Sequence, residues 1–362
     1  MSTQSLGWER YLINAGADAK TFAQQAVGRV TAENKNNWIV GTDSGEYIAV
    51  ILRNFAPANP IPKAGDWITF SKVENDKEKI LITAVLPRFS TLSRITPKAN
   101  PNPDAPDVKQ ILAVNVDTAF VVQGLDANFN PNRIERYLVM IRQGGTKPAI
   151  ILNKTDIAQN MDAVKQAMRE RFPGVPVFFI SATTGQGTED LTNAIAPGET
   201  VTFLGSSGVG KSTLLNALLG ADIQATGAVR DKDSKGKHTT TRRELFVLPN
   251  GGIVIDTPGM RELQISADTG QVADTFGQID RLARQCRFSD CDHEQSKGCA
   301  IRDAVARGDV PEALYKSFIK LRREAEFNES KDSVQYQQTK KQFWKSIHKS
   351  LKLKNDFDHK EK

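Results

Sequence analysis

The chain has 362 residues, of which 25% are charged and 39% are hydrophobic. This is the composition of an ordinary soluble protein, and the length allows two or three domains, each with its own core. The formal net charge of +6 favours a polyanionic partner such as nucleic acid. No stretch has the length and apolarity of a membrane span, and the N-terminus carries no secretory signal. We therefore expect a cytoplasmic protein with no membrane contact.

Residues 24–88 form a pattern of short β-branched and aromatic runs, after a brief helical segment near Trp8. The five runs are residues 26–30, 37–40, 46–52, 66–70 and 79–85. Five strands in about 65 residues predict a small closed barrel such as an OB-fold, which we assign to residues 1–88. Such barrels often bind RNA, but some only pack on a neighbouring domain, and the strand pattern leaves both roles open.

Residues 89–108 are rich in proline, asparagine, serine and threonine, a composition typical of an extended linker. Beyond them strands alternate with helices, which predicts a parallel α/β sheet over residues 109–268. The expected strands are residues 116–122, 147–152, 175–180, 200–204, 244–248 and 252–255. A helical domain at 269–350 and a basic tail at 351–362 complete the predicted organisation.

The segment Gly205–Thr213 has the phosphate-loop pattern of glycine, four residues, then Gly-Lys-Ser. An apolar strand precedes it and a buried helix follows, so a chance glycine-rich turn is the weaker interpretation. Backbone N–H groups and the helix N-terminus would bind phosphates, Lys211 would reach the β- and γ-phosphates, and Ser212 would ligate Mg²⁺. The expected phosphate-binding residues are Gly205, Ser206, Ser207, Gly208, Val209, Gly210, Lys211, Ser212 and Thr213.

Two other strand ends carry a pattern for recognising guanine. The first is Asn153-Lys154-Thr155-Asp156 and the second is Ser181-Ala182. Asp156 would accept two guanine N–H bonds that adenine cannot offer, and a backbone N–H near Ala182 would face guanine O6. Asn153 would join neighbouring loops, and the stem of Lys154 would lie along the base. GTP is therefore favoured over ATP.

The polar stretch of residues 225–238 predicts a loop that ends in His238-Thr239-Thr240-Thr241. Thr239 or Thr240 would close over Mg²⁺ and the γ-phosphate. Asp256, at the end of an apolar strand, would hold Mg²⁺, and the N–H of Gly259 would contact the γ-phosphate. Met260 stands where many GTPases use a glutamine to orient water, so intrinsic hydrolysis should be slow.

Every cysteine of the chain lies in one cluster, Cys286, Cys291 and Cys299, together with His293. Three thiolates and one imidazole within fourteen residues make a closed tetrahedral set, typical of one structural Zn²⁺. Free buried thiols are the alternative. A basic helical stretch at residues 301–327 follows, which is either a solvated face or a phosphate-binding surface.

All the guanine-nucleotide elements are present in a rotated order, because the base-recognition loops precede the phosphate loop. This order resembles that of the circularly permuted GTPases. With a β-barrel in front and a Cys/His cluster behind, the chain looks like the RsgA (YjeQ) family of GTPases that depend on the small ribosomal subunit. The resemblance implies an OB-fold barrel, a permuted P-loop GTPase domain and a helical zinc domain. It also makes His238 a candidate to orient water, although an exposed loop histidine without a catalytic role is the alternative.

From the residues we expect a GTPase, and the resemblance implies hydrolysis of GTP to GDP in late maturation of the small subunit, by a monomer that binds the subunit and its rRNA. Subunit binding should stimulate turnover. Two alternatives remain open from the sequence. One is an RNA-binding module in which the nucleotide only stabilises the fold, and the other is a GTP-dependent factor for a different RNA or protein.

Overall fold

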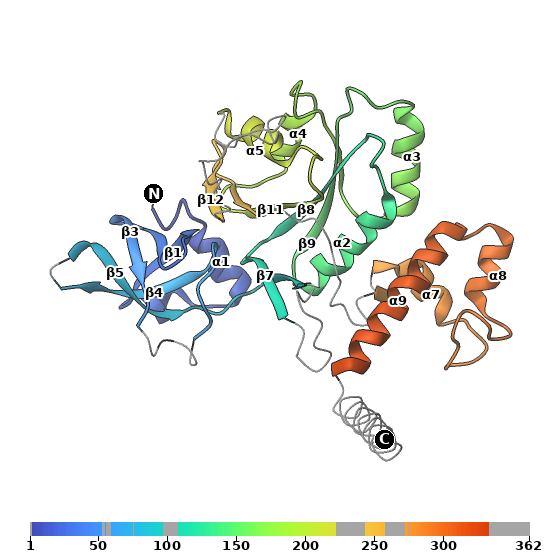
Figure 1. Ribbon diagram of the computed structural model, residues 1–362, viewed down its shortest axis with the longest axis horizontal. Helices are drawn as coiled ribbons and strands as arrows, with labels where there is room; N and C mark the ends of the chain where they lie inside the picture. Colours follow the sequence, from blue (N-terminus) through green and yellow to red (C-terminus); the bar gives the residue numbers. More distant parts are fainter. Residues whose placement is uncertain are drawn as a thin grey trace, which may run out of the picture. The chain divides into compact units, whose positions relative to one another are not determined.

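The computed structural model describes residues 2–52, 55, 59–74, 76–96, 108–221, 243–257, 272–273 and 275–332. The chain divides into two compact units, Met1–Gln264 and Ile265–Lys362. The first unit holds a β-barrel and an α/β domain, and the second is helical (Figure 1). Among the helices of the described part, none combines the length and the apolar composition needed to cross a bilayer.

The barrel contains five strands. They are β1 (Ala26–Glu33), β2 (Trp38–Thr42), β3 (Gly45–Val50), β4 (Trp67–Val73) and β5 (Asp76–Val85). The strands pair in the order β1-β2-β3-β5-β4, and a further β1–β4 pairing closes the barrel. β3 and β5 run parallel, while the other pairs are antiparallel. Alternate residues such as Val30, Val40, Ile68 and Ile80 fill the interior, so the predicted five-stranded barrel is confirmed.

An N-terminal helix packs the barrel against the α/β domain. Helix α1 (Trp8–Ala15) is followed by the short 3₁₀ helix η1 (Ala19–Phe22). The ring of Trp8 lies 4.7 Å from that of the buried Trp67 in the barrel, centroid to centroid. On the same helix, Arg10 forms an ion pair of 2.7 Å with Asp117 at the start of the α/β sheet. The helix therefore contacts both parts of the first unit.

The α/β domain contains a sheet with helices on both faces (Figure 1). Its strands are β8 (Thr118–Gly124), β9 (Lys147–Asn153), β10 (Val177–Phe179), β11 (Thr200–Leu204), β12 (Glu244–Val247) and β13 (Ile253–Asp256). Their order is β10-β9-β8-β11-β13-β12, parallel except for β12. Helices α2 (Pro131–Gln143) and α3 (Met161–Arg171) bury one face, and α4 (Thr188–Asn193) and α5 (Lys211–Leu219) bury the other. The predicted α/β alternation is confirmed.

Part of the segment that the sequence assigns to a linker is a strand. β6 (Thr91–Thr96) pairs antiparallel with β7 (Val108–Val114) as a separate two-stranded sheet. Leu92 is fully buried in the core that α2 also joins. The averaged composition of residues 89–108 hides this strand because the proline-rich residues that follow it dominate the window.

The described part of the second unit contains three helices longer than one turn, α7 (Gly277–Ala283), α8 (Ala300–Arg307) and α9 (Glu312–Asp332). The helical stretch expected at residues 301–327 is interrupted at Gly308, which has φ +82° and ends α8. A left-handed residue of this kind terminates a helix at low cost only when it is glycine. Pro311 then precedes the first residue of α9.

Candidate active site and metal centre

The phosphate loop connects β11 to α5 in the order that the motif requires. Gly208 has φ +82° and Gly210 has φ +94°, backbone conformations that favour glycine. A Cβ on Gly210 would lie 2.3 Å from Nδ2 of Asn153, so only glycine fits beneath that side chain. Ser212 and Thr213 lie in the first turn of α5, where the helix N-terminus favours anions.

Lys211, the first residue of α5, turns its ammonium group back onto the loop. Nζ donates to the carbonyl oxygens of Gly205 at 2.7 Å and of Ser206 at 2.8 Å. Ser207 and Gly208 at the loop tip are exposed, whereas Gly205 and Val209 are buried. The tip of the loop is therefore open to solvent, while Gly205 and Val209 on either side of the tip are packed in the protein interior.

Asn153 joins three loops of the site. Its Nδ2 donates to the carbonyl of Val209 in the phosphate loop at 2.9 Å, and its Oδ1 accepts from the N–H of Ala182 at 2.9 Å. The side chain is 3% exposed, so both bonds are protected from water. The carboxyl end of β9 is therefore tied to the phosphate loop and to the Ser181-Ala182 loop.

The base-recognition residues are placed around the same strand end. Lys154 adopts φ +67°, and the N–H of Thr155 donates to the carbonyl of Ile180 at 3.1 Å. Asp156 is exposed, whereas Ser181 is fully buried and Ala182 nearly so. The contacts that these residues would make with guanine remain predictions.

Two side chains that follow β8 reach this site and were missed in the sequence, Asp126 in the connection to α2 and Arg133 in the first turn of α2. Asp126 accepts from Nζ of Lys154 at 2.7 Å, and this hydrogen bond lowers the pKa of the Asp126 carboxyl. Nη1 of Arg133 donates to the hydroxyl of Ser206 at 3.2 Å. For Asp126 the available signal was its position directly after a buried strand, since carboxyl ends of parallel strands share one sheet edge. Arg133 lies further along the chain in α2 and offered no such signal.

Asp256 ends β13 at the same edge as the phosphate loop, because β13 pairs in parallel with β11. Burial raises the pKa of the Asp256 carboxyl, the positive charge of Lys211 opposes that rise, and the carboxylate of Glu244 adds to it. Asp256 and Lys211 therefore interact electrostatically. Such closeness is expected of a Mg²⁺-binding carboxylate and a phosphate-binding lysine that serve the same nucleotide.

The residues expected to respond to the γ-phosphate are His238, Thr239, Thr240, Thr241, Gly259 and Met260. All of them lie outside the described residues, so their roles remain predictions. The tail at residues 351–362 lies outside them too.

In the second unit, Cys286, Cys291, His293 and Cys299 come together. Their ligand atoms all lie within 4.8 Å of one another. Nδ1 of His293 is 3.6 Å from the sulfur of Cys286 and 3.7 Å from that of Cys299, and these two sulfurs are 4.0 Å apart. Tetrahedral zinc requires sulfur–nitrogen separations of about 3.6 Å and sulfur–sulfur separations of about 3.8 Å. The four residues therefore fit a tetrahedral metal ion.

The surroundings of the cluster orient its histidine. The hydroxyl of Tyr315 on α9 donates to the carbonyl of His293 at 2.9 Å. Oδ1 of Asp292 accepts backbone N–H bonds from Glu294, Gln295 and Ser296, each at 2.9 Å, which closes the turn after the histidine. Burial, followed by the charge of Arg322, lowers the pKa of the His293 imidazole. Both effects favour the neutral ring, which is the form that binds a metal.

The phosphate loop, both base-recognition loops and Asp256 meet at one sheet edge, although the base-recognition loops come first along the chain. This fold and this site define a circularly permuted P-loop GTPase. The family model described as RsgA GTPase matches residues 85–266. The chain belongs to the RsgA GTPase family, as the resemblance predicted.

Relatives match over nearly the whole chain. Small ribosomal subunit biogenesis GTPase RsgA 1 of Listeria innocua is 37% identical over 338 residues, covering 92% of this chain and 94% of the relative. Small ribosomal subunit biogenesis GTPase RsgA 2 of Lactiplantibacillus plantarum is 41% identical over 328 residues, covering 90% of each chain.

Two crystal structures have the same fold. YjeQ from Thermotoga maritima superposes with a TM-score of 0.63 at 26% identity, covering 83% of this chain and 98% of that one. YloQ, described as a circularly permuted GTPase, superposes with a TM-score of 0.60 at 20% identity, covering 86% and 98%. The predicted fold class, with a barrel and a permuted GTPase domain, is confirmed.

Proposed function

We propose that this chain binds the small ribosomal subunit and hydrolyses GTP to GDP and phosphate during late maturation of that subunit. The names of the relatives assign small-subunit biogenesis to them over nearly the same length of chain. The observation that carries the nucleotide part is the position of Asn153, which ties the phosphate loop to the base-recognition loops.

The nucleotide would bind with its phosphates on the loop Gly205–Thr213 and its base between Lys154 and the Ser181-Ala182 loop. The ammonium of Lys211 already binds two loop carbonyls, and phosphates offer it charged and therefore stronger acceptors. Asp156 is exposed at the strand end, where its carboxylate is free to accept the two guanine N–H bonds. Together these residues position GTP and favour it over ATP.

Two metals fit the residues present. Mg²⁺ would be held by the hydroxyl of Ser212 and, directly or through water, by Asp256, and it supplies charge neutralisation for the phosphates. Zn²⁺ would be held by the Cys₃His cluster, to which the described part of the chain adds no fifth ligand, and it would keep a structural role. His238 would orient the attacking water once the subunit is bound, with Thr239 or Thr240 closing over the magnesium.

The RNA partner would be rRNA of the small subunit, contacted by the barrel and by basic side chains. The net charge of +6 supports a polyanionic partner. A cytoplasmic location and a monomeric state complete the proposal.

Co-sedimentation with separated ribosomal subunits, combined with turnover measurements, tests this function. The protein should pellet with the small subunit and not with the large one, and the small subunit should accelerate GTP turnover. GTP should bind much more tightly than ATP. Binding to the subunit without faster turnover would indicate an RNA-binding module with a structural nucleotide. Failure to bind the subunit would indicate a different RNA or protein partner.

A further inference from the structure

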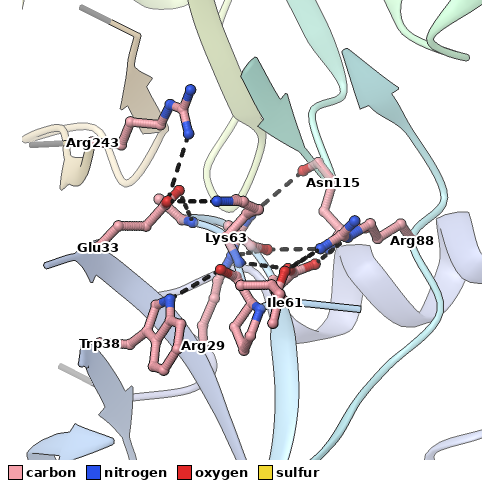
Figure 2. Close-up of polar contacts among 12 residues, drawn as sticks. Arg29, Glu33, Trp38, Ile61, Lys63, Arg88, Asn115 and Arg243 are labelled. Atoms are coloured by element: carbon pink, nitrogen blue, oxygen red, sulfur yellow. Dashed lines mark hydrogen bonds and ion pairs between the residues drawn. The ribbon is translucent and has the colours of Figure 1, made fainter. Parts of the chain in front are cut away.

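Glu33, the last residue of barrel strand β1, binds Lys63 and Ala64 of a barrel turn and Arg243 of the α/β domain (Figure 2). Its carboxylate lies 3.1 Å from Nζ of Lys63 and 3.5 Å from Nη1 of Arg243, and it accepts from the N–H of Ala64 at 2.9 Å. Its backbone N–H donates to the carbonyl of Arg243 at 3.1 Å. One barrel residue thus holds Arg243 by both its side chain and its backbone.

Arg243 immediately precedes β12. This strand pairs with β1 of the barrel on one side and with β13, which ends at Asp256, on the other. Ala32 of β1 pairs with Glu244 of β12, and Glu244 pairs with Asp256 of β13. These three residues form one rung across three strands. Glu33 follows Ala32 and Arg243 precedes Glu244, so the Glu33–Arg243 contact lies directly beside that rung. This contact therefore fixes the position of the first residue of β12 against the barrel.

The barrel turn that Glu33 binds, residues 63–66, also packs against the side chain of Ile255 in β13. Gly65 adopts φ +96°, and a Cβ there would lie 2.6 Å from Cδ1 of Ile255, the neighbour of Asp256. Oδ2 of Asp66 accepts from the N–H of Lys63, and Asp66 also binds the guanidinium of Arg88 at 2.6 and 2.8 Å. The turn is therefore rigid where it contacts the strand.

Polar side chains, among them the buried Arg29 and Asn115, meet at the junction beside this turn (Figure 2). Arg29 is 1% exposed and donates to the carbonyl oxygens of Leu6, Gly65 and Asn115. Asn115 in turn donates from Nδ2 to the carbonyl of Gly65 at 3.1 Å. Because partners for these groups come from both the barrel and the α/β domain, the two parts cannot shift here without breaking buried hydrogen bonds.

We propose that Glu33 is a positioning residue for GTP hydrolysis, supplied by the barrel. It acts through Arg243 on the rung that ends at Asp256, the carboxylate expected to hold Mg²⁺. The inference deepens the proposed function and rests on it. Without the Glu33 charge, Lys63 and Arg243 would face each other as two half-buried cations, and their repulsion would displace the start of β12.

The test is Glu33→Gln in the full-length protein, with kcat, KM, GDP affinity, thermal midpoint and the Mg²⁺ dependence of GDP release all measured. We expect kcat to fall about tenfold, because small displacements of catalytic groups are costly. The Mg²⁺ concentration that slows GDP release should rise severalfold. KM and GDP affinity should change little, since neither the phosphate loop nor the base-recognition loops contact Glu33.

Asp76→Asn is the matched control, because it removes the exposed barrel ion pair of Asp76 and Lys79 without touching β12. It should leave kcat and the Mg²⁺ dependence at wild-type values. If Glu33 acts through Arg243, then Glu33→Gln combined with Arg243→Gln should be no slower than the slower single variant.

Three outcomes would overturn the inference. They are unchanged kcat and Mg²⁺ dependence in Glu33→Gln, additive losses in the double variant, or losses of GDP affinity and thermal midpoint in proportion to kcat. The last would show a purely structural role. A wild-type protein that shows no GTP turnover, with or without small subunits, would instead contradict the proposed function. The Mg²⁺ dependence of GDP release would still test Glu33 in that case.

Discussion

Replacing Asn153 by alanine removes the side chain that joins three loops of the nucleotide site. Two hydrogen bonds disappear, one to the carbonyl of Val209 and one from the N–H of Ala182, both at 2.9 Å. Alanine offers no substitute, and with Asn153 only 3% exposed the two freed groups have little access to water. Each unpaired buried group costs about 1–3 kcal/mol, so the pair costs about 2–6 kcal/mol.

This cost can appear in two measurable quantities. If the loops stay in place, the free energy of unfolding falls, and 2 kcal/mol would lower the thermal midpoint by roughly 4–8 °C for a unit of this size. If the loops relax to reach water, they must be reordered when nucleotide binds. In that case 2 kcal/mol weakens GDP binding about 30-fold. Both losses reflect the same two hydrogen bonds.

Calorimetric titration with GDP and a thermal melt of the free protein separate the two contributions. Asn250→Ala is the matched control, because Asn250 donates to the carbonyls of Thr192 and Ile195 away from the nucleotide loops. It should lower the thermal midpoint and leave GDP affinity unchanged. If Asn153→Ala bound GDP as tightly as Asn250→Ala, Asn153 would not organise the site and the argument would be refuted.

Other substitutions probe the rest of the site. Gly210→Ala should weaken GDP binding more than Gly208→Ala in the same titration, because only at Gly210 would the added Cβ meet Asn153; equal losses would contradict this. Asp126→Asn should weaken GDP binding up to about fivefold by releasing Lys154, as expected for a partly exposed ion pair, and an unchanged affinity would show that the pair does not position the lysine. Removing metal from the Cys₃His cluster with a chelator should release one zinc per chain by elemental analysis and reduce helical circular dichroism. Metal affinity should fall as pH falls, because thiolates must compete with protons, and a pH-independent affinity would contradict thiolate ligation.

The sequence predicted those parts of the fold and site that have local patterns. The phosphate loop carries its glycines and lysine within nine residues, and its strand and helix lie on either side. The barrel strands are short β-branched and aromatic runs, and the cysteine cluster has the spacing of metal ligands. Each of these signals comes from residues that are close in the sequence, so a single sequence is enough to predict the feature.

Contacts between distant residues have no such local signal. The ion pair of Glu33 and Arg243 joins residues that no sequence pattern relates, and Asp126 looks like an ordinary loop aspartate until the carboxyl ends of β8 and β9 are placed side by side. β6 was missed for a similar reason, because its partner β7 lies beyond the proline-rich segment. These features depend on tertiary pairing, which composition and periodicity do not contain.

The rotated order of the GTPase elements has a consequence for synthesis of the chain. All five barrel strands leave the translating ribosome before β11 exists, so the barrel can fold while the nucleotide site is still incomplete. β12 and β13 emerge late, and β12 then pairs with the finished barrel at Ala32. We expect the barrel to act as a template on which the last strands of the sheet assemble, so that nucleotide first binds only after β13 has emerged.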